Sequence, residues 1–447
     1  MKKCKVILLA IIAFLLLTPA VYAQNTVYSR NKNKDEKLTH IKHSYNDKGN
    51  KEGFAVAGSY LNEKDNTKNY EVMLINYQEN GKVKWEFTYD KKQNSIVEDL
   101  EYTYNEENNI DGYLIVLGNK STEQEEANKP IFLKIDLDGK LVWEKDFSIN
   151  QNDKIYEINE THNDEGNLDG YIAIGSNKID KKALLIKYDK NCNLIWKKEY
   201  TSEEYKEINN KDIINIKDNG KEIGYAVIRE SITQNKELKA QIVRYNKDGD
   251  EEQLINDNLE KYDKYALGES NNGFLLYGIT SEVKLEQGNK SYFIINYNSN
   301  NEQIWETIGN SPVSKGKNIL LLPVKKENLI KKYLLLYSNS TDKSIEVIKI
   351  SIEGTIETKV KKIKNDYYDI ENFAEDKGVL YLVGQINCPK DDDCEYNTNS
   401  LFIISDEDKV IEVKDNDSKT ILIILIVFII TIISITWLRR KKKLKSN

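Results

Sequence analysis

The residues best suited to bond formation or cation binding are two cysteines that flank an acidic loop. Cys388 and Cys394 enclose Asp391, Asp392 and Asp393. In an exported chain, so short a separation across a loop predicts a local disulfide. The three carboxylates at its tip are either a contact point for a cation or basic partner, or solvated loop residues, and the sequence leaves both open.

Acidic residues also recur in predicted turns, which are the second place where a cation could bind. Calcium takes six to eight oxygen ligands from carboxylates and carbonyls. No turn has the spacing of a known calcium loop, and turn geometry alone explains Asp at a hairpin. We therefore predict no metal site at the turn acids, which are Asp136, Asp138, Asp189, Asp248 and Asp250.

Residue sets typical of catalysis are absent from the sequence. The only histidines are His40, His43 and His162, and no Gly-x-Ser-x-Gly motif, phosphate loop or zinc spacing occurs. An acid pair inside a channel stays open, because carboxylates are abundant and one sequence singles out none. We expect no catalytic residues, metal or cofactor, and the acidic charge argues against nucleic acid as a partner.

The N-terminus predicts export. Lys2, Lys3 and Lys5 precede the apolar run Val6–Leu17, and a small-residue cleavage site ends at Ala23. These are the three parts of a secretory signal peptide, which we assign to residues 1–23. The alternative is an uncleaved N-terminal anchor.

The C-terminus predicts a membrane anchor. Ile421–Leu438 is an uncharged run that would span about 27 Å as a helix. The basic tail at 439–447 places that end in the cytoplasm, and 414–420 is a short stalk. We expect a single-pass type I protein of the cell membrane with an extracellular ectodomain. Attachment to a cell wall is the alternative, although the segment before Ile421 lacks the Pro and Gly of a sorting motif.

Charge is distributed unevenly along the chain. The 447 residues contain 65 basic and 72 acidic side chains, for a net charge of −7. Nine basic residues belong to the two terminal segments, which leaves 56 basic against 72 acidic residues, or −16, for the region between them.

Tryptophans mark a repeated unit between the two ends. Trp85, Trp143, Trp196 and Trp305 occupy one phase relative to an apolar segment ahead of each, such as Leu74–Tyr77 before Trp85. A large apolar side chain at a fixed repeat position is typical of packing between neighbouring units. We assign these residues to blade packing, with ligand stacking as the alternative.

A second recurrent element fixes the period. An apolar segment recurs seven times, with steps that average about 54 residues, and it begins at Gly53, Gly112, Gly170, Gly224, Gly273, Lys332 and Gly378. Four strands fit each unit, with a turn such as Asp138-Gly139 between the third and fourth. The sequence predicts an all-β, seven-bladed β-propeller of four-stranded antiparallel blades over residues 24–413.

Two details of the predicted ring concern its closure and one turn. We expect the seventh copy to end at 411–413 and Thr26–Tyr28 to complete a blade. Cys192 replaces the turn residue aligned with Gly139, so we expect it to be exposed.

The repeats resemble the blades of bacterial and archaeal surface β-propeller proteins, and more loosely those of quinoproteins. The matching text is GYIAIGSN from Gly170, LLIKYDKNCNLIWKKEY from Leu184 and FLKIDLDGKLVWEKDF from Phe132. The resemblance implies a propeller outside the cytoplasm and no particular activity. We expect a non-catalytic binding or scaffolding module near the membrane, with a protein or cell-wall polymer as partner. A propeller enzyme acting on polysaccharide or peptide and a sensor signalling through a partner are the alternatives.

Overall fold

The computed structural model describes residues 26–412, apart from 31–35, 65–66, 91–94, 120–130, 147–149, 151, 257, 281–289, 310–312, 314–317, 327–328, 340–343, 365–367, 377–378, 387–398 and 407–410. The predicted signal peptide, stalk, membrane helix and basic tail lie outside these residues, as do Cys388, Cys394 and the acidic loop between them. Within the described part, no helix is long and apolar enough to cross a membrane. The chain divides into a large unit, Met1–Val410, and a second unit, Ile411–Asn447, whose described element is β29 (Ile411–Glu412).

Every described element is a strand, and the first three sheets follow the order of the chain. The first comprises β2 (Glu36–Tyr45), β3 (Lys51–Lys64), β4 (Thr67–Gln78) and β5 (Val83–Tyr89). The second comprises β6 (Ser95–Tyr104), β7 (Ile110–Asn119), β8 (Ile131–Asp136) and β9 (Leu141–Asp146). The third comprises β10 (Asp153–His162), β11 (Leu168–Asn177), β12 (Lys182–Asp189) and β13 (Leu194–Tyr200).

The next sheets repeat the arrangement. One comprises β14 (Tyr205–Asp218), β15 (Lys221–Thr233), β16 (Leu238–Asn246) and β17 (Glu251–Asn256). Another comprises β18 (Tyr262–Glu269), β19 (Phe274–Thr280), β20 (Tyr292–Tyr297) and β21 (Gln303–Ile308). A five-stranded sheet contains β22 (Ile319–Lys326), β23 (Leu329–Asn339), β24 (Ser344–Ser351) and β25 (Ile356–Lys364) in consecutive order.

The last sheet closes the ring. β26 (Tyr368–Asp376), β27 (Val379–Ile386) and β28 (Asn399–Asp406) supply three strands, and β1 (Thr26–Arg30) pairs antiparallel with β28. The N-terminal strand therefore completes this blade, as predicted. The expected fourth strand at 411–413 is wrong, because β1 occupies that edge.

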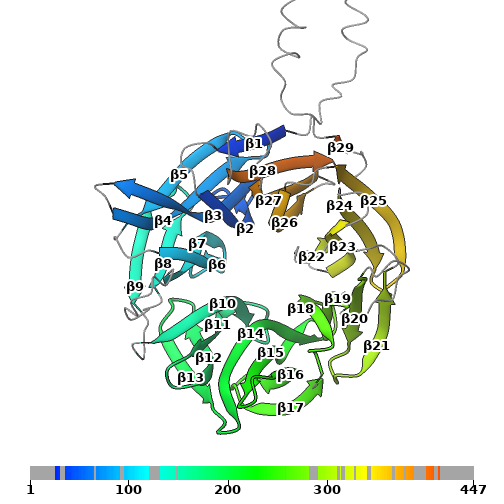
Figure 1. Cartoon of the computed structure of the whole chain (residues 1–447). Coiled ribbons are helices and arrows are strands. Elements are labelled where there is room, and N and C mark those ends of the chain that lie inside the picture. Colours follow the sequence, from blue (N-terminus) through cyan, green and yellow to red (C-terminus); the bar gives the residue numbers. More distant parts are fainter. Residues whose placement is uncertain are drawn as a thin grey trace, which may run out of the picture. The chain divides into compact units, whose positions relative to one another are not determined.

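The sheets of Met1–Val410 stand around a common axis, with the first strand of each sheet innermost (Figure 1). Successive first strands contact one another from β2 round to β26, and β26 contacts β2 again. The architecture is therefore a β-propeller built of four-stranded antiparallel blades. Six described sheets have four strands and the sheet of β22–β25 has five, so the prediction of seven four-stranded blades is wrong in this respect.

The core lies between the blades, since the second and third strands are covered on both faces. In β19 every residue from Phe274 to Thr280 is buried, and in β12 the run from Ala183 to Tyr188 is buried. Fully covered strands read as continuous apolar runs rather than as alternating ones. The outer fourth strands alternate only partly and carry charged residues, as expected for an edge that faces solvent.

One turn type joins the strands of most blades. The side-chain oxygen of the first turn residue accepts backbone N–H groups two and four positions later, as Asp189 does from Asn191 at 2.9 Å and Asn193 at 2.7 Å. The fourth residue of the turn adopts a positive φ, for example 84° at Gly139. Asn, Asp and Gly suit these two roles, which explains why they recur at the turns.

Candidate functional site

The candidate site is built on the innermost strands. In β2, β6, β10, β14 and β26 a register shift of the bulge type occurs within the strand, after Leu38, Val97, Ile155, Asn210 and Ile370 respectively. A bulge inserts one residue and re-aims the side chains that follow it. The residue after each of these shifts is polar: His40, Asp99, Glu157, Asp212 and Asn372.

The remaining two inner strands lack a shift at this position. Ala266 in β18 pairs with Tyr277, and Leu320 in β22 pairs with Leu336, in the same register as Glu157 with Ile174. The ring of equivalent positions is therefore polar along five blades and apolar along the other two. The polar residues at this one position therefore lie on consecutive inner strands, from β26 through β2, β6 and β10 to β14.

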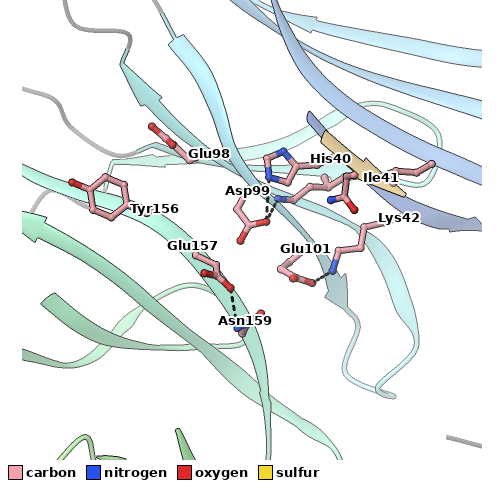
Figure 2. Close-up of a pocket in the computed structure, with 11 residues that line it drawn as sticks. His40, Ile41, Lys42, Glu98, Asp99, Glu101, Tyr156, Glu157 and Asn159 are labelled. Atoms are coloured by element: carbon pink, nitrogen blue, oxygen red, sulfur yellow. Dashed lines mark hydrogen bonds and ion pairs between the residues drawn. The ribbon is translucent and has the colours of Figure 1, made fainter. Parts of the chain in front are cut away.

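A cavity of about 390 Å³ lies on this polar side, among β26, β2, β6 and β10. Figure 2 shows acidic side chains from β6 and β10 on one side of it and His40 and Lys42 from β2 on the other. Tyr156 and Asn159 also line it. A cavity of this size is within the range of small-molecule sites in proteins.

Lys42 and Glu101 form the central ion pair. Lys42 Nζ lies 2.6 Å from Glu101 Oε2, and the side chain of Glu101 is 9% exposed. Burial alone would lower the pKa of Lys42, but Glu101, Glu160 and Asp99 together raise it above its usual value. Lys42 is therefore a cation held by surrounding carboxylates.

Asp99 links neighbouring blades. Its carboxylate accepts backbone N–H groups from Leu100 at 2.7 Å and from Ile158 of the next blade at 2.8 Å. His40 Nε2 lies 3.8 Å from the Asp99 carboxylate. Burial lowers the pKa of His40 to about 4, so this ring is neutral at pH 7 and the contact is not an ion pair there.

Glu157 and Asp212 form a carboxyl pair that hydrogen-bonds across two blades. Asp212 also accepts the Leu267 N–H at 2.7 Å. Burial raises the pKa of Asp212 to about 6 and that of Glu157 well above its usual value, with the negative charge of Asp212 adding to the latter shift. Two adjacent buried carboxyls resist double ionisation, so the pair shares a proton near neutral pH.

Glu160 lies in β10, one residue beyond Asn159. One of its oxygens accepts the Tyr104 hydroxyl at 2.9 Å, and the other is buried with no hydrogen-bond partner among the described residues. Burial raises the pKa of Glu160 to about 7, and the neighbouring charge of Glu101 contributes to the rise. Burial likewise raises the pKa of Glu101 to about 7.

The site therefore combines one fixed cation with several desolvated carboxyl groups. Within the described ranges, no three His, Cys, Asp or Glu side chains are arranged to hold a metal ion. The arrangement suits binding of a polar or cationic group, and the Glu157–Asp212 pair is also of the kind that exchanges protons.

The tryptophans lie at the junctions between blades. A Cβ added to Gly139, Gly249 or Gly354 would collide with the ring of Trp85, Trp196 or Trp305 respectively, each from the preceding blade. Trp85 Nε1 donates to Leu137 O at 2.9 Å, and Trp305 Nε1 donates to Ile352 O at 3.1 Å. Each pair joins the outer strand of one blade to the turn of the next.

Cys192 is buried, so the prediction that it is exposed is wrong. It belongs to a cluster with Tyr171 and Tyr188, and Trp143 packs against that cluster. The tryptophan of the preceding blade covers this turn position. The sequence of the turn alone does not indicate that contact.

Three of the turn acids, Asp136, Asp189 and Asp250, have structural partners. Asp136 accepts the backbone N–H groups of Asp138 at 3.0 Å and Lys140 at 2.8 Å, and Asp250 pairs with Lys198 at 2.7 Å. The pocket residues were missed because they share no motif. Aligning the first strands would have found them, since His40, Asp99, Glu157 and Asp212 each stand four positions before the residue that pairs with the repeat glycine.

No known protein family and no curated protein matches the sequence. Solved structures do resemble the chain in fold. The Dos1 propeller is 11% identical with a TM-score of 0.46 over 84% of this chain and 80% of its own. The WD40 domain of SCAP from fission yeast is 11% identical with a TM-score of 0.41 over 86% of this chain and 98% of its own.

Two enzymes have comparable similarity. Polysaccharide lyase Uly1 is 10% identical with a TM-score of 0.43, covering 87% of this chain and 94% of its own. A putative 6-phosphogluconolactonase from Bacteroides fragilis NCTC 9343 is 14% identical with a TM-score of 0.41, covering 78% of this chain and 97% of its own. At these identities the similarity concerns the fold alone and indicates no function.

Proposed function

We propose that the protein is a membrane-anchored, extracytoplasmic binding or scaffolding module that takes part of its ligand into the pocket on the polar side of the channel. The supporting observation is the concave site of about 390 Å³, in which charged side chains from three consecutive blades meet. A propeller supplies rigid walls for such a site, because each side chain comes from a strand rather than a loop. The ligand class expected from the sequence is a protein or a cell-wall polymer.

A pocket-filling variant tests this proposal. Glu98 lines the pocket and is half-buried, so Glu98→Trp should obstruct it, whereas Glu165 lies in an exposed turn and Glu165→Trp is the matched control. Binding of the full-length chain to immobilised envelope material is measured for both variants and the wild type. We expect a loss of at least tenfold in affinity for Glu98→Trp alone. Equal binding by all three would contradict the proposal.

The membrane anchor has its own test. The run 421–438 and its basic flank support a single-pass type I topology. We expect the chain to remain in membranes after alkaline extraction, with the propeller cleaved by protease added to intact cells. Release by a wall hydrolase, with fragments of peptidoglycan attached, would contradict membrane anchoring.

An enzyme acting on polysaccharide or peptide is the second candidate, and the Glu157–Asp212 pair is the observation that favours it. A pair that shares one proton can supply an acid and a base to one reaction. Under this candidate, Glu157→Gln and Asp212→Asn each lower product release from envelope polymer by at least a hundredfold, while Glu165→Gln has no effect. Release that is the same in all variants, and equal to a blank, would exclude it.

A further inference from the structure

We propose that His162 and Glu222 form a pH-dependent clasp between the third and fourth blades, and that the clasp holds most firmly under mildly acidic conditions. His162 is the last residue of β10, and Glu222 lies near the start of β15 in the next blade. The inference goes beyond the proposed function, because it concerns a conformational device in the ring and involves no ligand.

The clasp is a two-point contact. Glu222 Oε2 accepts the backbone N–H of His162 at 2.8 Å, and Glu222 Oε1 lies 2.9 Å from His162 Nδ1. Asn215 Nδ2 also donates to Glu222 Oε1, at 2.9 Å. The side chain of Glu222 is 5% exposed, whereas that of His162 is 32% exposed. A covered carboxylate is therefore held by neighbouring donors, while the imidazole ring can exchange a proton with solvent.

The same strand position makes a comparable contact in the neighbouring blades, with a different side chain in each. Tyr104, His162 and Lys217 all follow the last register shift of an inner strand. A phenol is neutral near pH 7, an ammonium group is positive, and an imidazole changes its charge there. Of these three donors, the His162 ring is therefore the one whose charge depends on pH in this range. The contacts are Tyr104 with Glu160 at 2.9 Å, His162 with Glu222 at 2.9 Å and Lys217 with Glu269 at 2.7 Å.

The protonated ring strengthens the contact. Glu222 raises the pKa of His162 above its usual value of 6.5, chiefly by accepting the hydrogen bond of the ring and also by its charge, while burial opposes the rise. A folded pKa above the unfolded one gives stabilisation that is fully present below about pH 6.5 and is lost as pH rises through the folded pKa. The neutral ring can still donate from Nδ1, but that bond is no longer assisted by a positive charge.

Charged and titratable groups surround the clasp on the elements packed against it. Glu160 favours the protonated ring and Lys217 opposes it. Glu160 has a pKa of about 7, so it ionises over the same range and should broaden the titration of His162 without abolishing it. The groups are Tyr104 from β6, Glu160 from β10, Asp164 from the following turn, Asp169 from β11, Lys187 from β12, Lys217 from β14, Lys221 and Tyr225 from β15, Lys247 and Asp248 from the turn after β16, and Glu269 from β18.

Histidine NMR tests the clasp directly, since the chain contains three histidines. The full-length protein, purified through a histidine-free tag, is labelled at its histidine rings and titrated from pH 5.5 to pH 9. Burial lowers the pKa of both His40 and His43 to about 4, so their signals should stay nearly constant over this range. We expect the His162 signal to titrate with a midpoint above 6.5. Glu222→Gln should lower that midpoint by about 0.5 pH unit or more.

Two isosteric variants measure the contribution of the charge. His162→Asn places an amide N–H where Nδ1 stands but cannot gain a proton. We expect its apparent unfolding constant, relative to wild type, to be about threefold greater at pH 5.5 than at pH 8. His43, whose Nε2 lies 3.2 Å from Glu375 O, gives a matched variant of opposite sign. With a pKa of about 4 its protonation favours the unfolded chain, so the same ratio for His43→Gln should be smaller at pH 5.5 than at pH 8.

Three outcomes would each overturn the inference. They are a His162 midpoint at or below 6.5, a midpoint that Glu222→Gln leaves unchanged, and a ratio for His162→Asn that is the same at both pH values or moves in the direction of His43→Gln. If a variant does not fold, the midpoint measured on the wild type still decides the matter. These measurements use no ligand and no envelope material, so their failure leaves the proposed function to its own tests.

Discussion

The buried acidic side chains of the inner strands lower the stability of the folded protein at neutral and alkaline pH. Glu101, Glu157, Glu160 and Asp212 all have raised pKa values because burial disfavours their charged forms. Folding therefore takes up protons at these positions between about pH 4.5 and 7. The pocket should be less favourable for folding at alkaline pH than at mildly acidic pH.

Glu160→Gln tests this cost. The unfolded pKa of Glu160 is near 4.5 and the folded pKa is about 7, so its penalty is absent below pH 4.5, grows between these values and is complete above pH 7. Gln keeps an acceptor for Tyr104 and removes the charge. We expect the variant to be more stable than wild type by about 2 kcal/mol at pH 8 and equally stable near pH 4.5. Denaturant unfolding at the two pH values measures the difference, and a variant no more stable at pH 8 would contradict it.

The tryptophan at a blade junction has the opposite role. Trp85 packs on Gly139 and donates to Leu137 O, so Trp85→Ala removes apolar contact and one hydrogen bond. We expect a loss of about 3 kcal/mol in unfolding free energy. Val83, which is 53% exposed on the same strand, gives a matched control: Val83→Ala should change stability by less than about 0.5 kcal/mol. Equal effects of the two variants would show that the junction is not stabilising.

In several blades a glycine at or near the start of the second strand lies very close to the backbone of the third strand. No side chain fits at that glycine. A Cβ at Gly170 would lie 2.0 Å from Tyr188 O. Gly53, Gly224 and Gly273 make the same approach to a tyrosine carbonyl oxygen at the end of the partner strand, those of Tyr77, Tyr245 and Tyr297 respectively. This contact explains why glycine marks the start of the repeat in these blades, while Lys332 holds the position in the blade of β23.

Two alanine variants distinguish the effect of the close contact between strands from the effect of a positive φ in a turn. Gly170→Ala forces backbone of β11 away from β12, whereas a Cβ at Gly166, in the preceding turn, meets nothing within 4 Å. We expect Gly170→Ala to cost at least about 2–3 kcal/mol and Gly166→Ala, with φ of 81°, only about 1 kcal/mol. Thermal unfolding compares them, and a larger loss for Gly166→Ala would contradict the argument.

The elements were predictable because period, turn chemistry and apolar runs agree with one another. Glycine positions and the phase of Trp85, Trp143, Trp196 and Trp305 predicted the strands and their order. The burial of Cys192 was not predictable, since it depends on Trp143 from another blade. Aligning the first strands would have placed His40, Asp99 and Glu157 at one repeat position, but it would not have shown that they meet at a pocket, because that depends on bulges and no local pattern marks a bulge.

At the scale of the whole molecule, stability depends on a single joint between distant parts of the chain. Thr26 pairs with Ile404, and the register continues to Arg30 with Ser400. The last blade has three strands of its own, so β1 supplies the fourth and holds the ring shut.

Proline substitutions in β1 test the joint. In an edge strand, only every second residue donates a backbone hydrogen bond to the neighbouring strand. Val27 and Tyr28 are consecutive, so only one of the variants Val27→Pro and Tyr28→Pro removes a donor to β28. We expect one variant to lose about 3 kcal/mol and become sensitive to protease, while the other retains most of its stability. Limited proteolysis and thermal unfolding report both, and two equally stable variants would show that β1 does not hold the ring.

The same joint sets an order of events during synthesis. The two partners of the closing pair are almost the whole propeller apart along the chain. At roughly 5–20 residues per second, β1 must wait tens of seconds before β28 exists. During that interval β2 to β25 can already be folded, while β1 is an unpaired strand with an open hydrogen-bonding edge. The newly made chain therefore passes through an open-ring state, and that state, rather than the finished protein, is the one most in need of protection from aggregation.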